Sequence, residues 1–323
     1  MSDVGPAAAR TQLVEAIGQE LARPVPAALQ ALVEHARARH GETVAAVLFY
    51  GSCLRQGAEL DLAGSVLDLY VLVDAYGRAF RRRLAAWANR QLPPNVFFVD
   101  LPWGRERVRA KYAVVSVDQF RRRSRDAAAH PYFWARFAQP MRLVHARDEA
   151  IADAVRDGLV DALATFASQT AALVEGPVDP RRFWSAGLGA TFRAELRSEG
   201  PERAGELAVA DGARIERLTL PALRAAGLRP VEAADGTFTV PLDAEERRRR
   251  MKLWRRSWLI GKPLSLARLA KALFTFEGGV DYVLYKIERH TGRRPEISPF
   301  ERRHPLLCAP ILLWRARSQK FAR

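Results

Sequence analysis

Gly51 and Ser52 directly follow a short apolar run at residues 44–50. Asp68 lies within a second apolar run, at residues 67–73. A glycine at a strand end lets the backbone approach a bound anion closely, and the serine hydroxyl and nearby amides donate to phosphate oxygens. A carboxylate on the adjacent strand can hold Mg²⁺ against the same oxygens. The pattern predicts a triphosphate site with Mg²⁺ on Asp68, although an ordinary strand-ending turn has the same residue types.

The second metal ligand is open between two carboxylates. An acid two residues after Asp68 would share its strand face, but that position is Tyr70. Asp74 has the same parity, yet six residues at about 3.3 Å each put it roughly 20 Å from Asp68 on a straight strand. Asp100, at the end of the third expected strand, has better geometry. Asp74 and Asp100 are therefore both candidate metal ligands.

Lys111 stands at the start of a fourth apolar run, residues 112–116. A lysine in this place can reach a β- or γ-phosphate as a point charge. Lysines at strand ends are also common on protein surfaces, so the spacing alone leaves both interpretations open.

The alternation of short apolar runs with helical periods predicts an α+β fold with a mixed sheet. Strands are expected at residues 44–50, 67–73, 96–100, 112–116 and 141–145. Helices are expected twice within residues 10–39, at residues 78–91, and over most of residues 118–174.

A linker at residues 175–180 predicts two domains, residues 1–174 and residues 181–323. The second domain is expected to be mainly helical, with helices near residues 183–198 and 201–225. The pair Asp235-Gly236 predicts a small hairpin, because Asp-Gly favours positive φ in a turn.

The chain has 323 residues, and 49% of them are hydrophobic, enough for a full core. Its 51 Lys and Arg against 36 Asp and Glu give a formal net charge of +15, which favours an anionic partner. The two cysteines, Cys53 and Cys308, lack the spacing of a zinc site or disulfide framework. No signal peptide is expected, and no run approaches the roughly 20 apolar residues of a spanning helix. We therefore expect a cytoplasmic protein, with any membrane contact peripheral.

Four segments in the first half of the chain resemble successive blocks of the mitochondrial type of phosphatidate cytidylyltransferase, the family of translocator maintenance proteins. The blocks are FYGS at residues 49–52, LDLYVLVD at 67–74, VFF at 96–98 and KYAVVS at 111–116. Weaker similarity follows in WARFAQP at residues 134–140, GATFRAELRSE at 189–199, SLARLAKALFTFE at 265–277 and YVLYK at 282–286. The resemblance thus covers roughly residues 45 to 290.

The resemblance implies a nucleotidyltransferase-type sheet domain followed by a helical domain. It implies transfer of CMP from CTP to phosphatidic acid, which gives CDP-diacylglycerol and pyrophosphate in phospholipid biosynthesis with Mg²⁺ as cofactor. Asp68 and Lys111 would be catalytic, and the nucleotide would be bound by Tyr50, Gly51, Ser52 and Lys111. The metal would be held by Asp68 with Asp74, which has the family's support, or Asp100, which has none. No histidine base is expected, since the attacking phosphate is already an anion.

The chain departs from the family pattern at three places. A Gly-Asp pair in the family is Gly189-Ala190 here, a Lys-Gly pair is Lys271-Ala272, and an asparagine of the third strand is Val99. The role of the missing aspartate does not carry over.

A lipid acceptor implies an anionic membrane surface as partner, with the protein peripherally associated with the inner face of the membrane. Basic residues beside tryptophans suit a headgroup boundary. We expect docking through residues 247–250 with Trp254 and Trp258, and through the basic tail at residues 304–323.

Two alternatives remain open. The same chemistry could serve a different acceptor, such as a small alcohol, a sugar or an RNA end. The chain could also be a catalytically inactive, RNA-binding relative, which the missing acid at Tyr70 and the basic charge favour, whereas the preferred hypothesis involves no nucleic acid.

Overall fold

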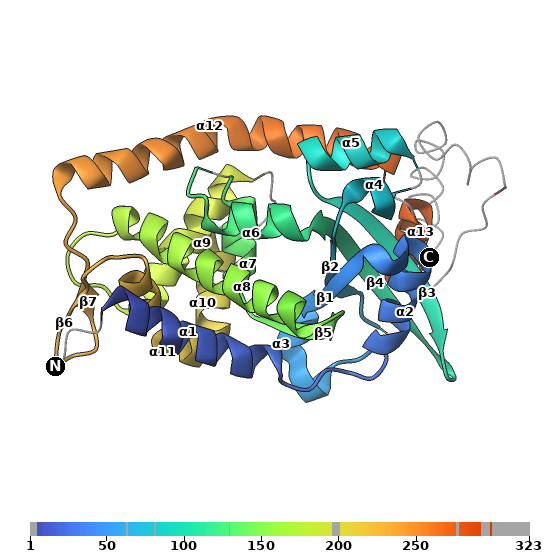
Figure 1. Ribbon diagram of the computed structural model, residues 1–323, viewed down its shortest axis with the longest axis horizontal. Coiled ribbons are helices and arrows are strands. Elements are labelled where there is room, and N and C mark those ends of the chain that lie inside the picture. The colour runs from blue at the N-terminus through green and yellow to red at the C-terminus, as the bar shows by residue number, and fades with distance from the viewer. Residues whose placement is uncertain are drawn as a thin grey trace.

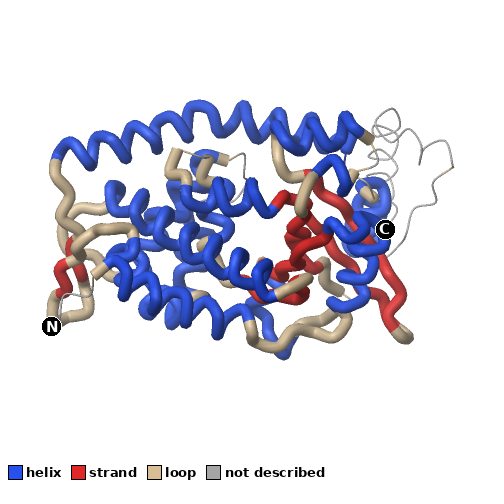
Figure 2. Tube along the Cα trace, viewed as in Figure 1, coloured by secondary structure: helices blue, strands red, loops and turns tan. Residues whose placement is uncertain are grey.

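The computed structural model describes residues 5–62, 64–80, 82–128, 130–195, 201–275 and 278–291, together with Ser298. The protein has an α+β fold, as predicted, with a mixed five-stranded sheet and a larger helical part (Figure 1). Figure 2 shows the main strands gathered towards one end of the molecule, while helices make up most of the other end.

The sheet has the strand order β3-β4-β2-β1-β5. Its strands are β1 (Val44–Tyr50), β2 (Leu67–Val73), β3 (Asn95–Trp103), β4 (Glu106–Ser116) and β5 (Met141–Ala146). β2 runs parallel to β4, and the other neighbouring pairs are antiparallel. All five predicted strands are confirmed.

β3 and β4 extend beyond the predicted strands, because their pairing continues to Trp103 opposite Glu106 at the tip of a long hairpin. Gly104 makes the turn with a positive φ of 58°. Asp100 therefore lies within the hairpin, opposite Arg109, and does not end a strand as predicted.

The two faces of the sheet carry different apolar clusters, since successive side chains of a strand point to opposite sides. Tyr70 and Leu72 belong to the cluster with the helical part, whereas Leu69 and Val71 belong to the cluster under α2 (Leu29–His40).

The remaining helices are α1 (Pro6–Leu21), α3 (Ser52–Gln56), α4 (Tyr76–Ala79), α5 (Arg83–Gln91), α6 (Val117–Arg125), α7 (Tyr132–Phe137), α8 (Glu149–Thr170), α9 (Pro180–Ala194), α10 (Pro201–Ala210), α11 (Gly212–Ala225), α12 (Ala244–Thr275) and α13 (Gly279–Thr291). The single helix predicted at residues 78–91 is two helices, α4 and α5. The backbone is extended at Phe80, with φ −118° and ψ 128°, and the Phe80 ring is buried against Phe97. The helix is thus interrupted where the Phe80 ring enters the core.

One apolar cluster crosses the predicted domain boundary at residues 175–180. It includes Phe166 of α8 and Trp184 of α9, whose ring centroids are 4.5 Å apart, and it continues to Trp254 of α12. The small predicted hairpin is present as β6 (Val231–Glu232) and β7 (Phe238–Thr239), and Phe238 pairs with Val178 in the linker. The two predicted halves therefore share a core.

The expected membrane role is wrong for Arg250, Trp254 and Trp258, whose side chains pack against the protein, whereas Arg248 and Arg249 of the same predicted segment are exposed. Trp254 and Arg250 are buried, and the Trp254 Nε1 group donates to the carbonyl of Gln169 at 3.0 Å. The Trp258 Nε1 group donates to the carbonyl of Ala190, also at 3.0 Å. The tail at residues 304–323 lies outside the described residues.

Among the helices of the described ranges, none combines the length and apolar character needed to cross a bilayer.

Candidate active site

The turn after β1 brings the backbone against Asp68. Gly51 has a φ of 91°, which side-chain-bearing residues rarely adopt. A Cβ atom at Gly51 would lie 2.9 Å from Oδ2 and 3.3 Å from Cβ of Asp68. Only glycine fits both the conformation and the space, and α3 begins at the next residue, the exposed Ser52. The predicted association of the Gly51-Ser52 turn with Asp68 is therefore present.

Asp68 and Lys111 form an ion pair on neighbouring parallel strands. The register places Lys111 of β4 opposite Asp68 of β2, and Nζ lies 3.4 Å from Oδ1. Tyr50 of β1 is opposite Asp68 on its other side, so the three side chains form a row across three strands. The side chains of Asp68 and Lys111 are 26% and 33% exposed. An ion pair this open contributes little to stability and remains accessible to a charged ligand.

Aromatic rings from α13 and β3 cover Lys111. Its Nζ lies 5.5 Å from the ring centroid of Tyr282. Phe98, opposite Lys111 on β3, packs against Tyr282 with the ring centroids 5.3 Å apart. The hydroxyl of Tyr285 donates to the carbonyl of Gly64, in the loop before β2, at 3.0 Å. α13 is thereby held over the sheet end that carries Asp68 and Lys111.

Behind the row lies a cluster of tyrosines and arginines. The rings of Tyr50 and Tyr70 stack at 4.8 Å, and the hydroxyls of Tyr70 and Tyr132 are 3.3 Å apart. The guanidinium of Arg136 lies 5.6 Å from the centroid of Tyr50, and that of Arg268 lies 4.8 Å from the centroid of Tyr132. Burial raises the pKa of the Tyr50 and Tyr70 hydroxyls, so both remain protonated donors. Tyr70 thus occupies, as an aromatic core residue, the position where a second carboxylate would share the face of Asp68.

The structure brings neither Asp74 nor Asp100 to Asp68. Asp74 follows the opposite end of β2, and Arg147 donates to it with bonds of 2.7 and 3.2 Å. Asp100 shares a sheet face with Asp68, but it lies two strands and two residues away, on the order of 12 Å between Cα atoms. Its oxygens accept from Arg107 and Arg109. Both acids already have arginine partners, and the metal roles predicted for them have no support in this geometry.

The side chains near Asp68 suit a Mg²⁺ ion that takes only one ligand from the protein. The described residues contain no group of three or more His, Cys, Asp or Glu side chains that could hold a metal. Protein sites for Mg²⁺ often supply only one or two carboxylates and leave the other positions to substrate phosphates and water. Asp68, partly exposed beside the Gly51 turn, fits that role. A closed site made by the protein alone does not fit these residues.

Arg136, Tyr132 and Arg268 were not predicted from the sequence as neighbours of Tyr50 and Tyr70. Arg136 and Arg268 lie within the segments at residues 134–140 and 265–277 that resemble the family. This resemblance was the one sequence feature that could have indicated a role for them. Their spacing along the chain gives no indication that α7 and α12 would meet above β1 and β2.

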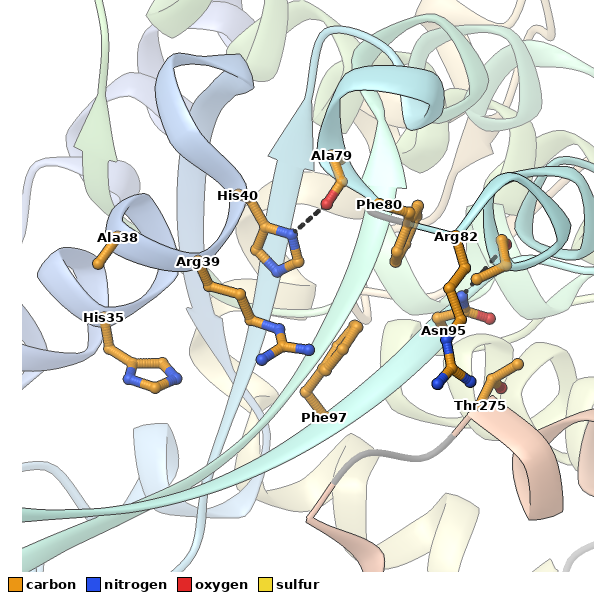
Figure 3. A pocket seen from close by; sticks show the side chains of 11 residues that line it. His35, Ala38, Arg39, His40, Ala79, Phe80, Arg82, Asn95, Phe97 and Thr275 are labelled. Carbon is orange, nitrogen blue, oxygen red and sulfur yellow. Dashed lines mark hydrogen bonds between the residues drawn. The ribbon is translucent and has the colours of Figure 1, made fainter.

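A cavity of about 610 Å³ lies on the other face of the sheet (Figure 3). Arg39 and His35 of α2 line it together with Arg82 and Phe97, and none of the predicted site residues does. Figure 3 shows His40 at its wall, where Nδ1 lies 2.8 Å from the carbonyl oxygen of Ala79. The cavity is separate from the Asp68–Lys111 pair, because Phe97 and Phe98 point to opposite faces of β3.

Comparisons with models of known protein families and with curated proteins find no match to this chain.

Proposed function

We propose that the protein is a nucleotidyltransferase that transfers CMP from CTP to phosphatidic acid, releasing pyrophosphate and giving CDP-diacylglycerol. The observation that carries the proposal is the Asp68–Lys111 pair beside the Gly51 turn. A carboxylate, a lysine and the backbone amides at the start of a helix suit a triphosphate better than an uncharged ligand.

The order of elements supports a nucleotidyltransferase-type sheet domain. A strand ends in a Gly-Ser turn, a short helix follows, and the antiparallel neighbouring strand carries the aspartate. The helical region after residue 180 would close the site through α13, whose Tyr282 lies over Lys111.

In the proposed reaction, an oxygen of the phosphatidate phosphate attacks the α-phosphorus of CTP. The bond from that phosphorus to the oxygen bridging the β-phosphate breaks, and pyrophosphate takes the electron pair. Ser52 and the amides of the turn would orient the phosphates, and Lys111 would offset their negative charge. No general base is needed, since the attacking oxygen is already anionic. Mg²⁺, held by Asp68 and the phosphates, would supply further charge stabilisation when bound.

A lipid acceptor requires the enzyme to work at a membrane surface. The net charge of +15 favours an anionic one, and we propose peripheral association with the cytoplasmic, inner face of the membrane.

The test is release of pyrophosphate by the purified protein, with each of the four nucleoside triphosphates in turn and Mg²⁺ present. The acceptors are phosphatidate vesicles, phosphatidylcholine vesicles, a single-stranded RNA and a soluble alcohol. We expect release that depends on CTP and phosphatidate together. Release with RNA or with a soluble alcohol would point to another acceptor. RNA binding with a steep salt dependence and no release with any pair would identify an inactive binding protein.

A further inference from the structure

α12 has a buried side and an outward side over residues 248–272. Buried Arg250 and Trp254 and half-buried Arg268 mark the inner side. Figure 1 shows α12, in orange, running along the upper edge of the molecule. At about 100° per residue, the exposed residues of this helix fall on one outward stripe.

The second half of that stripe is mainly apolar and includes one exposed lysine, Lys262. Leu259, Leu266 and Leu269 are 78%, 60% and 54% exposed, and Ile260 is 41% exposed. Soluble proteins tolerate single exposed leucines, but several on one helix stripe mark an interaction surface. We call these four residues the apolar half of the outer face.

The first half of the stripe is basic. Its exposed side chains are Arg248, Arg249, Lys252, Arg255 and Arg256, which we call the basic half. After Glu246, α12 contains no acidic residue. A positive stripe continuous with exposed leucines is complementary to an anionic bilayer, where cations meet the lipid phosphates and leucines enter the headgroup boundary.

The apolar half lies at the end of α12 that is joined to the candidate active site. Lys271 donates to the carbonyls of Leu92 and Pro94, just before β3. Gly278 then passes so close to β3 that a Cβ atom would lie 2.3 Å from the carbonyl oxygen of Phe98. α13 follows and places Tyr282 over Lys111.

α5, whose end is fixed to α12 by the Lys271 contacts, adds two exposed apolar side chains. Leu84 is 80% exposed and Trp87 is 63% exposed. Arg82, before α5, and Thr275, the last residue of α12, line the same cavity, which places the two helix ends together.

We infer that the outer face of α12 is the bilayer-docking surface of this protein: its apolar half inserts into an anionic leaflet next to the active site, and its basic half lies along the lipid phosphates. The choice of a lipid surface over a protein partner rests on the proposed lipid acceptor and on the absence of acidic residues after Glu246 in α12. Docking in this orientation presents lipid headgroups at the end of the helix that leads to Lys111.

The experiment is co-sedimentation of the full chain with vesicles of phosphatidylcholine, with and without phosphatidylglycerol. Neither lipid is the proposed acceptor, so the result does not depend on catalysis or on CTP. We expect binding only to the anionic vesicles, and weaker binding as salt is added. Leu259→Asp with Leu266→Asp should lower the partition coefficient at least about 10-fold. Lys252→Gln, Arg255→Gln and Arg256→Gln should each lower it about fivefold.

The control is Val209→Asp, which adds one negative charge where the double leucine variant adds two, on a 66% exposed residue of α10, and it should bind as the wild type does. Unchanged binding by the double leucine variant, or equal binding to neutral vesicles, would overturn the inference. Light scattering completes the test: if the wild type is a dimer and the leucine variant a monomer with vesicle binding intact, the face binds a second copy and the inference is wrong. The double leucine variant should lose vesicle binding but still release pyrophosphate with a short-chain, soluble phosphatidate. That result would support the docking surface independently of the proposed reaction.

Discussion

At the scale of single residues, the site depends on how Gly51, Asp68 and Lys111 constrain one another. The close approach of Gly51 to Asp68 leaves no room for a side chain in the turn, and the parallel register of β2 and β4 places Lys111 beside the same carboxylate. Tyr50 and Tyr70 form an aromatic wall behind them. The chemistry is concentrated on one carboxylate and one cation, and substrate phosphates must complete any metal site.

Asp68→Asn should lower kcat at least about 100-fold, because it removes several kcal/mol of charge stabilisation while it preserves shape. The free energy of unfolding should change by less than about 1 kcal/mol, since the pair with Lys111 is partly exposed. Pyrophosphate release and urea denaturation measure the two effects. Asp74→Asn is the matched control, and its activity should stay near that of the wild type. Equal loss of activity in both variants would contradict the single-carboxylate site.

His130 should make stability depend on pH. It is buried, and burial, followed by the charge of Arg268, lowers its pKa to about 4. Since the unfolded state has the higher pKa of 6.5, it binds more protons, and stability present above pH 6.5 is lost as the pH falls towards 4. The loss should be about 2 kcal/mol between pH 7 and pH 5. His130→Asn keeps an acceptor for the amide of Tyr132 and should flatten the dependence in urea denaturation. If the free energy of unfolding of this variant changes with pH as it does in the wild type, a group other than His130 causes the dependence.

The parts of the candidate site that lie within one strand or one turn could be predicted from the sequence. Gly51, Ser52 and Asp68 stand out because glycine and acidic residues interrupt apolar runs. The second metal ligand was not predictable, since the length of the β3–β4 hairpin and the arginine partners of Asp100 depend on pairing between strands. Straight-strand spacing argued against Asp74 and the family resemblance argued for it; in the structure Asp74 follows the end of β2 remote from Asp68, so the resemblance was misleading at this position.

At the scale of elements, α12 has an inner side that packs into the core and an outer side that we propose docks on a bilayer. Its inner side packs Trp254 against Trp134 of α7, with the ring centroids 5.6 Å apart. The outer side presents leucines and arginines to solvent. Trp254 and Trp258 lie beside basic residues in the sequence, which is typical of a membrane-contacting segment. Composition alone does not show which side of a helix meets the core, so the prediction for these two tryptophans was wrong.

Trp254→Ala should therefore destabilise the protein by about 3–5 kcal/mol, the usual cost of removing a large buried aromatic side chain. Arg255→Ala, on the next residue and exposed, should cost less than about 0.5 kcal/mol. Chemical denaturation of both variants gives the comparison. A small effect of Trp254→Ala would mean that this tryptophan is not packed as the structure has it.

Most strands and helices were predictable because their period is short and local. The division of residues 78–91 into α4 and α5 was not, since it depends on burial of Phe80 against Phe97 of β3. The paths of α12 and α13 back to the sheet were equally hidden, because contacts such as that of Lys271 with the chain before β3 join distant parts of the sequence.

At the scale of the whole molecule, the sheet and the helices share one apolar cluster, which runs from Leu13 to Trp254. The boundary predicted at residues 175–180 therefore divides a core. A fragment of residues 1–174 would expose Phe166, which packs on Trp184 in the intact chain.

We expect this fragment to show no cooperative thermal unfolding, because it lacks the other half of its core. The full chain should unfold in one transition. Circular dichroism of both would measure this. A fragment that melts cooperatively near the temperature of the full chain would show that the first 174 residues are an independent domain.

The proposed reaction moves the α-phosphate of CTP, with its cytidine, to phosphatidate. The most direct measurement is transfer of label to the lipid phase from CTP labelled at either the α- or the γ-phosphorus, with Mg²⁺ and phosphatidate vesicles. Nucleotidyl transfer predicts lipid-soluble label from α-labelled CTP only, in one-to-one amount with released pyrophosphate, and none with Asp68→Asn. Label that enters the lipid from the γ-position, or from neither position, would show that the protein does not transfer CMP to phosphatidate.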